Sequence, residues 1–327
     1  MQLRRAACCG REDDQEMNTS LVLMSKLISM MLVGAVGYLV IHIGLWEERD
    51  KKQLAKLSLY VLGPCLLIKA FRIELTPERI RGYLCAVVFA FLVHAGFLLI
   101  ARLLEHLGIL GLVESLSIVF TNCGNLILPI VSMTLGDHMV FYGSAFQLGF
   151  NFFFWTYAAA RMQGSRKIDW KKVLLNPNII AIAFSVCLLI AHISIPGPVF
   201  TAVEMLADMV GPASMLVIGM TLADSSLLQI FTNKKAYLVS FLRLIALPFL
   251  TLGILRASGF LHRFPEFIPV FRVSFLAVAA PPAANIPQLA VVYNKEPARA
   301  GIYNLMGMML CMFTIPLIDY LYMLSFA

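Results

Sequence analysis

Long apolar runs separated by short polar segments repeat along almost the whole chain. A helix needs about 20 apolar residues to cross the hydrocarbon core of a bilayer. Ten runs approach or exceed that length, at residues 20–46, 54–71, 83–104, 109–135, 139–160, 174–194, 199–223, 236–257, 267–292 and 300–325. This pattern predicts an all-α polytopic membrane protein with ten transmembrane helices.

Composition supports the same class. Of the 327 residues, 60% are apolar and 14% are charged, and the mean hydropathy is +0.82. A soluble domain is typically about half apolar and about a quarter charged, and a disordered chain is less hydrophobic still. Because ten spans leave only short loops between them, we expect no second soluble domain.

Residues 1–19 form a polar N-terminal tail without an apolar core of its own. Arg4 and Arg5 are followed by acidic residues and not by an apolar stretch, so we expect no cleavable signal peptide. Met17 and Met24 are alternative start positions, which leaves open whether residues 1–16 belong to the expressed protein.

The basic residues are distributed unevenly between the two ends of the predicted spans. The net charge of +7 forms no basic block interleaved with aromatic residues, so we expect contact with an anionic membrane surface and not with nucleic acid. Thirteen Lys and Arg residues lie on the side that includes the 161–173 loop, and eight lie on the other side. The positive-inside rule then predicts a multi-pass cell-membrane protein with a cytoplasmic 161–173 loop and with both termini outside.

The cysteines and histidines form no pattern of a metal centre. Five of the seven cysteines lie inside apolar runs, no CxxC pair is present, and the six histidines are dispersed. We therefore expect no metal, no cofactor and no disulfide framework.

The longest polar loop, 161–173, divides the chain into two five-helix repeats, at 20–160 and 174–327. An odd number of spans in each half makes the halves run in opposite directions through the membrane, as in an inverted repeat. The fourth span of each half contains both proline and asparagine, in TNCGNLILP (121–129) and AAPPAANIPQ (279–288). Interrupted spans at matched positions of inverted repeats often form the binding site of a transporter.

Proline interrupts a helix because it donates no backbone hydrogen bond and clashes with the preceding turn. Two broken helices that cross near the membrane midplane would present half-helix N-termini, with partial positive charge and spare N–H donors. Asn122, Asn125 and Asn285 add side-chain amides beside the breaks. We expect this crossing to bind an anion, most simply a carboxylate, with roughly micromolar to millimolar affinity. No fixed cation at the crossing is needed for this binding.

Other polar residues lie inside the apolar spans. Gln147 and Asn151 are one turn apart, and they either face the crossing or form interhelical hydrogen bonds. Asp208 is the candidate residue for coupling to protons or sodium, with a capping or edge role as the alternative. Arg243 and Arg272 are costly in lipid, so we expect both to face protein or water.

Three further polar positions are expected at span ends. Lys69 either snorkels to the membrane interface or faces a cavity. Tyr303 and Asn304 are expected nearer the membrane edge, in structural roles.

At the interrupted spans the chain resembles the auxin efflux carrier family, which includes plant auxin carriers and bacterial malonate-type carriers. The fourth span of that family reads N-T-G-x-x-G-x-P. Asn122, Gly124 and Pro129 hold the matching places, while Cys123 replaces the threonine and Ile127 replaces the second glycine.

The ninth span of the family carries P-x-x-x-x-P in plant members and P-x-x-N in many bacterial ones. Pro282, Asn285 and Pro287 satisfy both patterns, and the likeness extends over about residues 23–325. The resemblance implies two inverted five-helix repeats with the substrate site at the crossing. It also implies transport of small organic anions, such as malonate-like or auxin-like acids, by an elevator-type movement.

A secondary transporter is therefore the leading interpretation, and no catalytic residue is assigned. The chain contains no HExxH, no GxSxG and no phosphate-cradling loop, which disfavours an intramembrane enzyme. A channel needs a ring of repeated donors or charges, and a receptor usually carries a soluble domain. The expected partners are a small carboxylate, the lipid bilayer, a coupling ion (proton or sodium) and, if the protein pairs through one face, a second copy in a homodimer.

Overall fold

The computed structural model describes residues 28–70, 76–164, 171, 174–175, 177–191, 193–223 and 231–326. Within these ranges the chain is helical and has no β-strand apart from one isolated bridge. The polar tail at 1–19 and most of the 161–173 loop lie outside the described residues.

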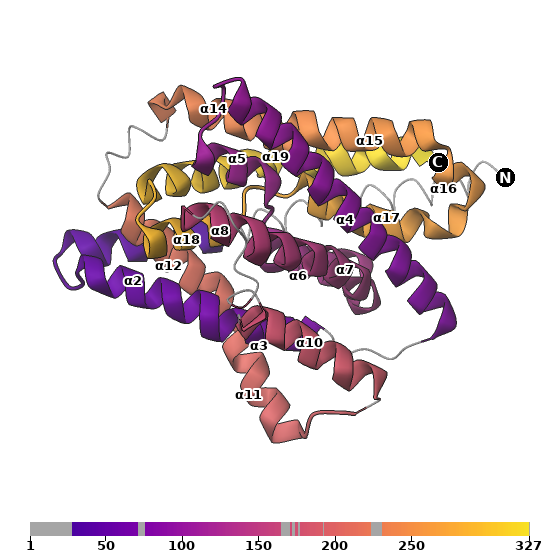
Figure 1. Cartoon of the computed structure of the whole chain (residues 1–327), viewed down its shortest axis with the longest axis horizontal. Coiled ribbons are helices and arrows are strands. Elements are labelled where there is room, and N and C mark those ends of the chain that lie inside the picture. The colour runs from indigo at the N-terminus through magenta and orange to yellow at the C-terminus, as the bar shows by residue number, and fades with distance from the viewer. Residues whose placement is uncertain are drawn as a thin grey trace, which may run out of the picture.

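The helices of the first predicted repeat follow one another in short steps (Figure 1). In order they are the helix Ile28–His42, α2 (Glu48–Leu57), η1 (Ser58–Leu62), α3 (Gly63–Ala70), α4 (Pro77–His106), α5 (Leu112–Val119), η2 (Cys123–Ile127), α6 (Leu128–Leu135), α7 (Asp137–Phe153), η3 (Phe154–Ala158) and α8 (Ala159–Met162). The elements η1, η2 and η3 are single π-helical turns that continue into the next α-helix.

The second predicted repeat has a similar succession of helices. They are α10 (Pro177–Ile190), α11 (Gly197–Asp208), α12 (Val210–Leu222), α14 (Lys234–Phe241), the π-helical turn η4 (Leu242–Ala246), α15 (Leu247–Ser258), α16 (Phe260–Arg263), the 3₁₀ turn η5 (Pro265–Phe267), α17 (Ile268–Ala279), α18 (Asn285–Tyr293) and α19 (Pro297–Phe326).

Several of these helices are long and apolar enough to cross a membrane. Four qualify by length and composition, namely Pro77–His106, Gly197–Leu222, Lys234–Ser258 and Pro297–Phe326, and each overlaps a predicted span. Shorter apolar helices occupy Ile28–His42 and Pro177–Ile190. An all-helical, multi-pass membrane protein is thereby confirmed, while the count of ten spans and the inverted repeat stay predictions.

The helix α4 illustrates how one span divides its surface between lipid and protein. Leu84, Val88, Leu92, Leu99 and Leu103 recur at spacings of four and seven residues and remain exposed. Residues at these spacings lie on one helix face, so this face is suited to contact lipid. The opposite face is buried and packs against α7.

Two predicted spans are interrupted within their proline- and asparagine-containing motifs, although Pro129 lies inside α6, beyond the first break. Residues 120–122 separate α5 from η2, and residues 280–284 separate α17 from α18. The backbone N–H of Asn122 donates to the carbonyl of Pro281 at 2.8 Å, and that of Ala283 donates to the carbonyl of Phe120 at 2.9 Å. The two breaks therefore meet, and each supplies backbone hydrogen-bond partners that the other has lost.

Side chains of α19 complete the pairing of the breaks. Asn304 donates through Nδ2 to the carbonyl of Pro282 at 2.6 Å. A Cβ on Gly307 would lie 2.3 Å from Pro282 Cδ, so only glycine permits this approach. Tyr303 and Asn304 are both fully buried, and Tyr303 donates to Glu114 at 2.8 Å, which agrees with the structural roles expected of them.

Arg243 in η4 binds both interrupted helices from their C-terminal ends. Its side chain is fully buried, and it donates to the carbonyls of Ala280 at 3.0 Å, Ile118 at 3.1 Å and Val278 at 2.5 Å. Carbonyls in the last turn of a helix lack intrahelical donors and form the negative end of the helix dipole. A guanidinium is suited to this position because it offers several N–H groups and a positive charge.

Arg243 and Arg272 were expected to face protein or water, and both face protein. Arg272 forms a two-point contact with Asp319, at 2.9 and 2.7 Å. A fixed cation does lie near the crossing, because Arg243 binds backbone carbonyls of both breaks, but it does not line the cavity described below.

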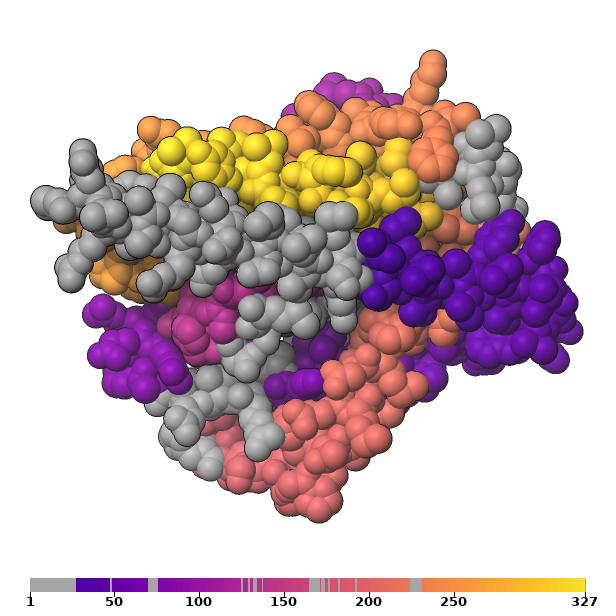
Figure 2. Space-filling view, turned by 180° about the vertical axis from the view of Figure 1, so that it is seen from behind, coloured from indigo at the N-terminus to yellow at the C-terminus, as the bar shows by residue number. Residues whose placement is uncertain are grey.

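Small residues allow the helix Ile28–His42 to approach α12 closely. A Cβ on Gly219 would lie 1.8 Å from the carbonyl oxygen of Gly34, and a Cβ on Gly37 would lie 2.3 Å from that of Leu216. Small residues are the usual means by which membrane helices bring their backbones together. In Figure 2 the indigo start of the described chain accordingly lies between the yellow C-terminal helix and the salmon-coloured α11 and α12.

Replacing Arg243 by methionine should lower the stability of the protein strongly. Three buried carbonyls would lose their donor, and each unsatisfied buried group costs about 1–3 kcal/mol. Thermal unfolding of the detergent-purified protein measures this effect. Arg256→Met is the matched control because Arg256 is exposed in α15. Equal unfolding temperatures for the two variants would contradict the assigned role.

Candidate functional site

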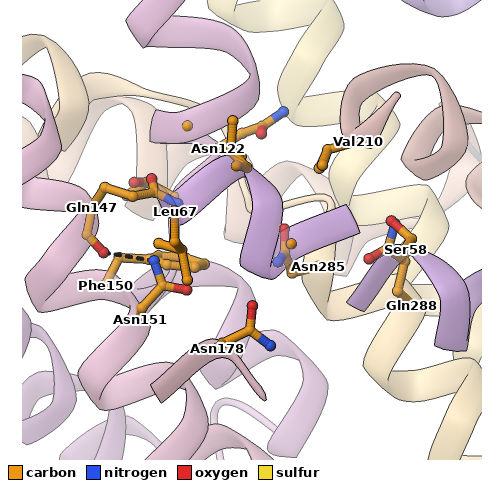
Figure 3. A pocket seen from close by; sticks show the side chains of 14 residues that line it. Ser58, Leu67, Asn122, Gln147, Phe150, Asn151, Asn178, Val210, Asn285 and Gln288 are labelled. Carbon is orange, nitrogen blue, oxygen red and sulfur yellow. Dashed lines mark hydrogen bonds between the residues drawn. The ribbon is translucent and has the colours of Figure 1, made fainter. Parts of the chain in front are cut away.

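A small cavity lies beside the paired breaks, where the half-helices η2–α6 and α18 begin (Figure 3). Its walls come from both predicted repeats. The lining residues are Ser58, Gly63, Leu66, Leu67, Thr121, Asn122, Gly124, Gln147, Phe150, Asn151, Asn178, Val210, Asn285 and Gln288. None of these described residues is charged, and eight of them carry an amide or hydroxyl group.

Five of the candidate residues from the sequence line this one cavity. They are Asn122, Gly124, Gln147, Asn151 and Asn285. The structure thus brings together side chains from both breaks and from α7, although up to 163 positions separate them along the chain.

The remaining candidates occupy other places. Pro282 and Pro287 are buried next to the cavity-lining residues but do not line the cavity themselves. Asn125 and Pro129 lie on η2 and α6, and their side chains are outside the described part of the structure. Asp208 lies at a second cavity.

The breaks direct hydrogen-bond donors toward the cavity. Asn122 is the N-cap residue of η2, and its Nδ2 is buried without a hydrogen-bond partner. Asn285 is the first residue of α18, a helix of nine residues. The first backbone N–H groups of a helix have no intrahelical acceptor and form its positive end. Two such ends and the Asn122 amide favour an anion.

Gln147 lies against the first turn of η2. Its Oε1 accepts a hydrogen bond from the Cys123 thiol at 2.9 Å, and its backbone carbonyl accepts one from Asn151 Nδ2 at 2.8 Å. A Cβ on Gly124 would lie 2.8 Å from Gln147 Oε1 and 2.9 Å from Nε2. The absence of a side chain at Gly124 therefore provides the space that the Gln147 amide occupies.

Ser58, Asn178 and Gln288 were not identified as candidates from the sequence. Gln288 donates to Ser58 Oγ at 3.0 Å and to Ser214 Oγ at 2.7 Å, and Asn178 donates to the carbonyl of Leu59 at 2.8 Å. Gln288 ends the second interrupted motif, and Asn178 follows a proline at the start of an apolar run. These signals could have indicated both residues, whereas nothing in the sequence distinguishes Ser58.

The cavity is too small for an organic anion in this conformation. Its volume is about 20 Å³, which is enough for about one water molecule. A second cavity of about 200 Å³ adjoins it, and both are lined by Leu66 and Gly124. Binding of a carboxylate beside the breaks therefore requires the walls of the smaller cavity to separate.

Asp208 lines the second cavity and is paired with a cation. Its Oδ1 lies 2.6 Å from Lys69 Nζ, which links α11 to α3. Lys69 is not among the lining residues of either cavity, so its two expected roles, snorkelling to the interface or facing a cavity, stay predictions. The structure does not bring Asp208 together with the amides beside the breaks. Within the described residues, no group of three or more His, Cys, Asp or Glu side chains could hold a metal ion.

The second half of the chain is similar to a known protein family. Residues 161–319 match a family model described as "Membrane transport protein". The matched segment includes the second interrupted span and the residues Asn178, Asn285 and Gln288. No curated protein matches the chain.

Replacing Gly124 by alanine should weaken the binding of small carboxylates about tenfold or more. The added methyl would displace the Gln147 amide, and one hydrogen bond to a charged group contributes about 1.5–3 kcal/mol. Stability should change little, because the displaced group is the end of a flexible side chain. Isothermal titration with mono- and dicarboxylates measures the loss. Gly253→Ala is the control, since nothing lies within 4 Å of its added Cβ. Equal affinities in both variants would contradict this assignment.

Proposed function

We propose that this chain, whose residues 161–319 match the membrane transport protein family of the auxin efflux carriers, is a secondary carrier of small organic anions. Its substrates are carboxylates such as malonate-like or auxin-like acids. Because members of this family are transporters, the match favours transport over an intramembrane enzyme, a channel or a receptor.

The observation that carries this proposal is the uncharged cavity between two half-helix N-termini. Helix ends contribute about 0.3–2 kcal/mol to anion binding, and hydrogen bonds from Asn122, Asn285 and Gln147 contribute about 1.5–3 kcal/mol each to a charged acceptor. Desolvation of a carboxylate costs several kcal/mol. The balance gives an affinity between roughly micromolar and millimolar, which suits a carrier that must release its substrate.

We also propose that the fold consists of two inverted five-helix repeats, 20–160 and 174–327. Support comes from the breaks, because Thr121 and Pro282 form an antiparallel bridge. Corresponding segments of an inverted repeat must run in opposite directions where they meet. Each repeat then contributes one interrupted helix to the site.

An elevator-type movement follows from the position of the cavity between two packed groups of helices. On one side are α3, α10 and α11, which pack together and lie at one end of the molecule in Figure 1. On the other side, α7 and the breaks carry Asn122, Gln147 and Asn285. Sliding the second group past the first would separate Leu66 and Leu67 from these amides and open the cavity.

Coupling to an ion gradient has one candidate carboxylate, Asp208. Its contact with Lys69 joins α11 to α3 at the second cavity, which shares Gly124 with the binding cavity. Protonation of Asp208 or sodium binding to it would release Lys69. We propose that this exchange links the ion gradient to the separation of the helices.

Asn122→Ala and Asn285→Ala should each lower carboxylate uptake at least about tenfold. Each variant removes an amide from the cavity, and a hydrogen bond to a charged group contributes about 1.5–3 kcal/mol. Uptake into proteoliposomes measures transport, and a thermal-shift screen of small carboxylates identifies the substrate. Gln163→Ala is the control because Gln163 is exposed and lies outside the cavity. Normal uptake by both cavity variants would refute the site.

Single cysteines at Gln163 and His262 should be labelled from opposite sides of the membrane. Both positions are exposed, and the distribution of basic residues places Gln163 in the cytoplasm and His262 outside. An impermeant maleimide on intact cells should modify His262→Cys, and should modify Gln163→Cys only after permeabilisation. Labelling is compared with the parent protein. The reverse pattern would overturn the predicted orientation. Labelling of both cysteines from the same side would contradict an odd number of spans between Gln163 and His262.

A further inference from the structure

Cys123 occupies the first position after the break, at the start of η2. Its side chain is fully buried, and its thiol donates to Gln147 Oε1 at 2.9 Å. We propose that Cys123 is a positioning residue that makes the cavity selective for anions, an inference that rests on the proposed function. Its thiol holds the carbonyl end of the Gln147 amide, so that the NH₂ end is available to the substrate.

A glutamine amide has an acceptor end and a donor end of nearly the same shape. A half-turn of the Gln147 amide would exchange these ends with little change in packing. Gly124 leaves space for either arrangement, since its missing Cβ would be almost equally close to Oε1 and Nε2. The position of the amide is therefore set by Gly124, whereas its orientation depends on the polar partner beside it.

The thiol of Cys123 is that partner. A thiol is a weak donor and sulfur is a weak acceptor, so the contact is modest in strength. In the reversed orientation the sulfur could only accept from the NH₂ end, so the preference is the difference between these two contacts. A net hydrogen bond of about 0.5–1.5 kcal/mol, or about two- to tenfold, is its upper bound. A preference of this size suffices to tune substrate selection without determining whether the protein folds.

In the preferred orientation of the Gln147 amide, its NH₂ group joins the other hydrogen-bond donors of the cavity. Asn122 Nδ2 is buried without a partner, and the half-helix N-termini present further N–H groups. With its NH₂ end free, Gln147 adds a donor to this set. In the reversed orientation Oε1 would face the anion and repel it, while a neutral amide ligand would be accepted in either case.

The test compares Cys123→Ala, Cys123→Ser and wild type in proteoliposomes. Two pairs of probes are used, malonate with malonamide and indole-3-acetate with indole-3-acetamide. We expect Cys123→Ala to raise KM for the acid of the transported pair two- to tenfold with little change in kcat and none for the amide. Cys123→Ser should retain the wild-type KM, because a hydroxyl also donates to Oε1.

Two controls separate positioning from packing. Cys311→Ala removes another fully buried thiol, which donates to the carbonyl of Met308 and does not line the cavity, so KM should stay unchanged. In a Gln147→Ala background the effect of Cys123→Ala should disappear, because the group that it orients is gone.

The outcomes distinguish this inference from the proposed function. If wild type transports one of the acids but Cys123→Ala matches it, or Cys123→Ser loses as much as Cys123→Ala, the positioning role is wrong and the transport function stands. An effect that persists in the Gln147→Ala background refutes the role as well. If wild type transports neither acid, the proposed function fails and this inference fails with it.

Discussion

The structure depends on Arg243, which donates hydrogen bonds to backbone carbonyls at the ends of two interrupted helices. These carbonyls have no donor within their own helices. Interrupting a membrane helix exposes carbonyls at its C-terminal end, and lipid offers no donors to them. One guanidinium donates to carbonyls at the ends of both α5 and α17. Because its charge is used on this side of the crossing, the opposite side retains two uncompensated N-termini. The anion site that we propose is therefore made from neutral amides and helix N-termini.

The same arrangement explains why the cavity is both polar and small. Backbone bonds between the breaks and the contact from Asn304 hold the two half-helix starts together. Leu66 and Leu67 from α3 close the space in front of them. A site that is rigid on one side and closed by a separate helix group on the other would suit the proposed alternating access, in which the donors would move together while the cover changes.

Much of this arrangement could be predicted from local sequence signals. Apolar runs locate the helices, because each span must satisfy its own backbone and face lipid along one side. Proline locates the second break, at Pro281 and Pro282, whereas Pro129 lies seven residues beyond the first break, inside α6. Asparagine in the same two motifs identifies Asn122 and Asn285 as site candidates. Ser58 could not be predicted, because its role depends on Gln288, which lies 230 positions away. Arg243 was recognised only as a cation that must avoid lipid, since its three acceptors are distant in the sequence.

The sequence by itself determined the class of protein, the places where its helices are interrupted and the chemical character of the residues beside them. These properties follow from composition and from spacing over a few residues, which the chain carries whatever its neighbours are. Only the tertiary structure decided that the breaks hydrogen-bond to each other, that Arg243 serves both and that Cys123 binds Gln147. Such contacts depend on where distant segments pack, and local periodicity holds no information about that.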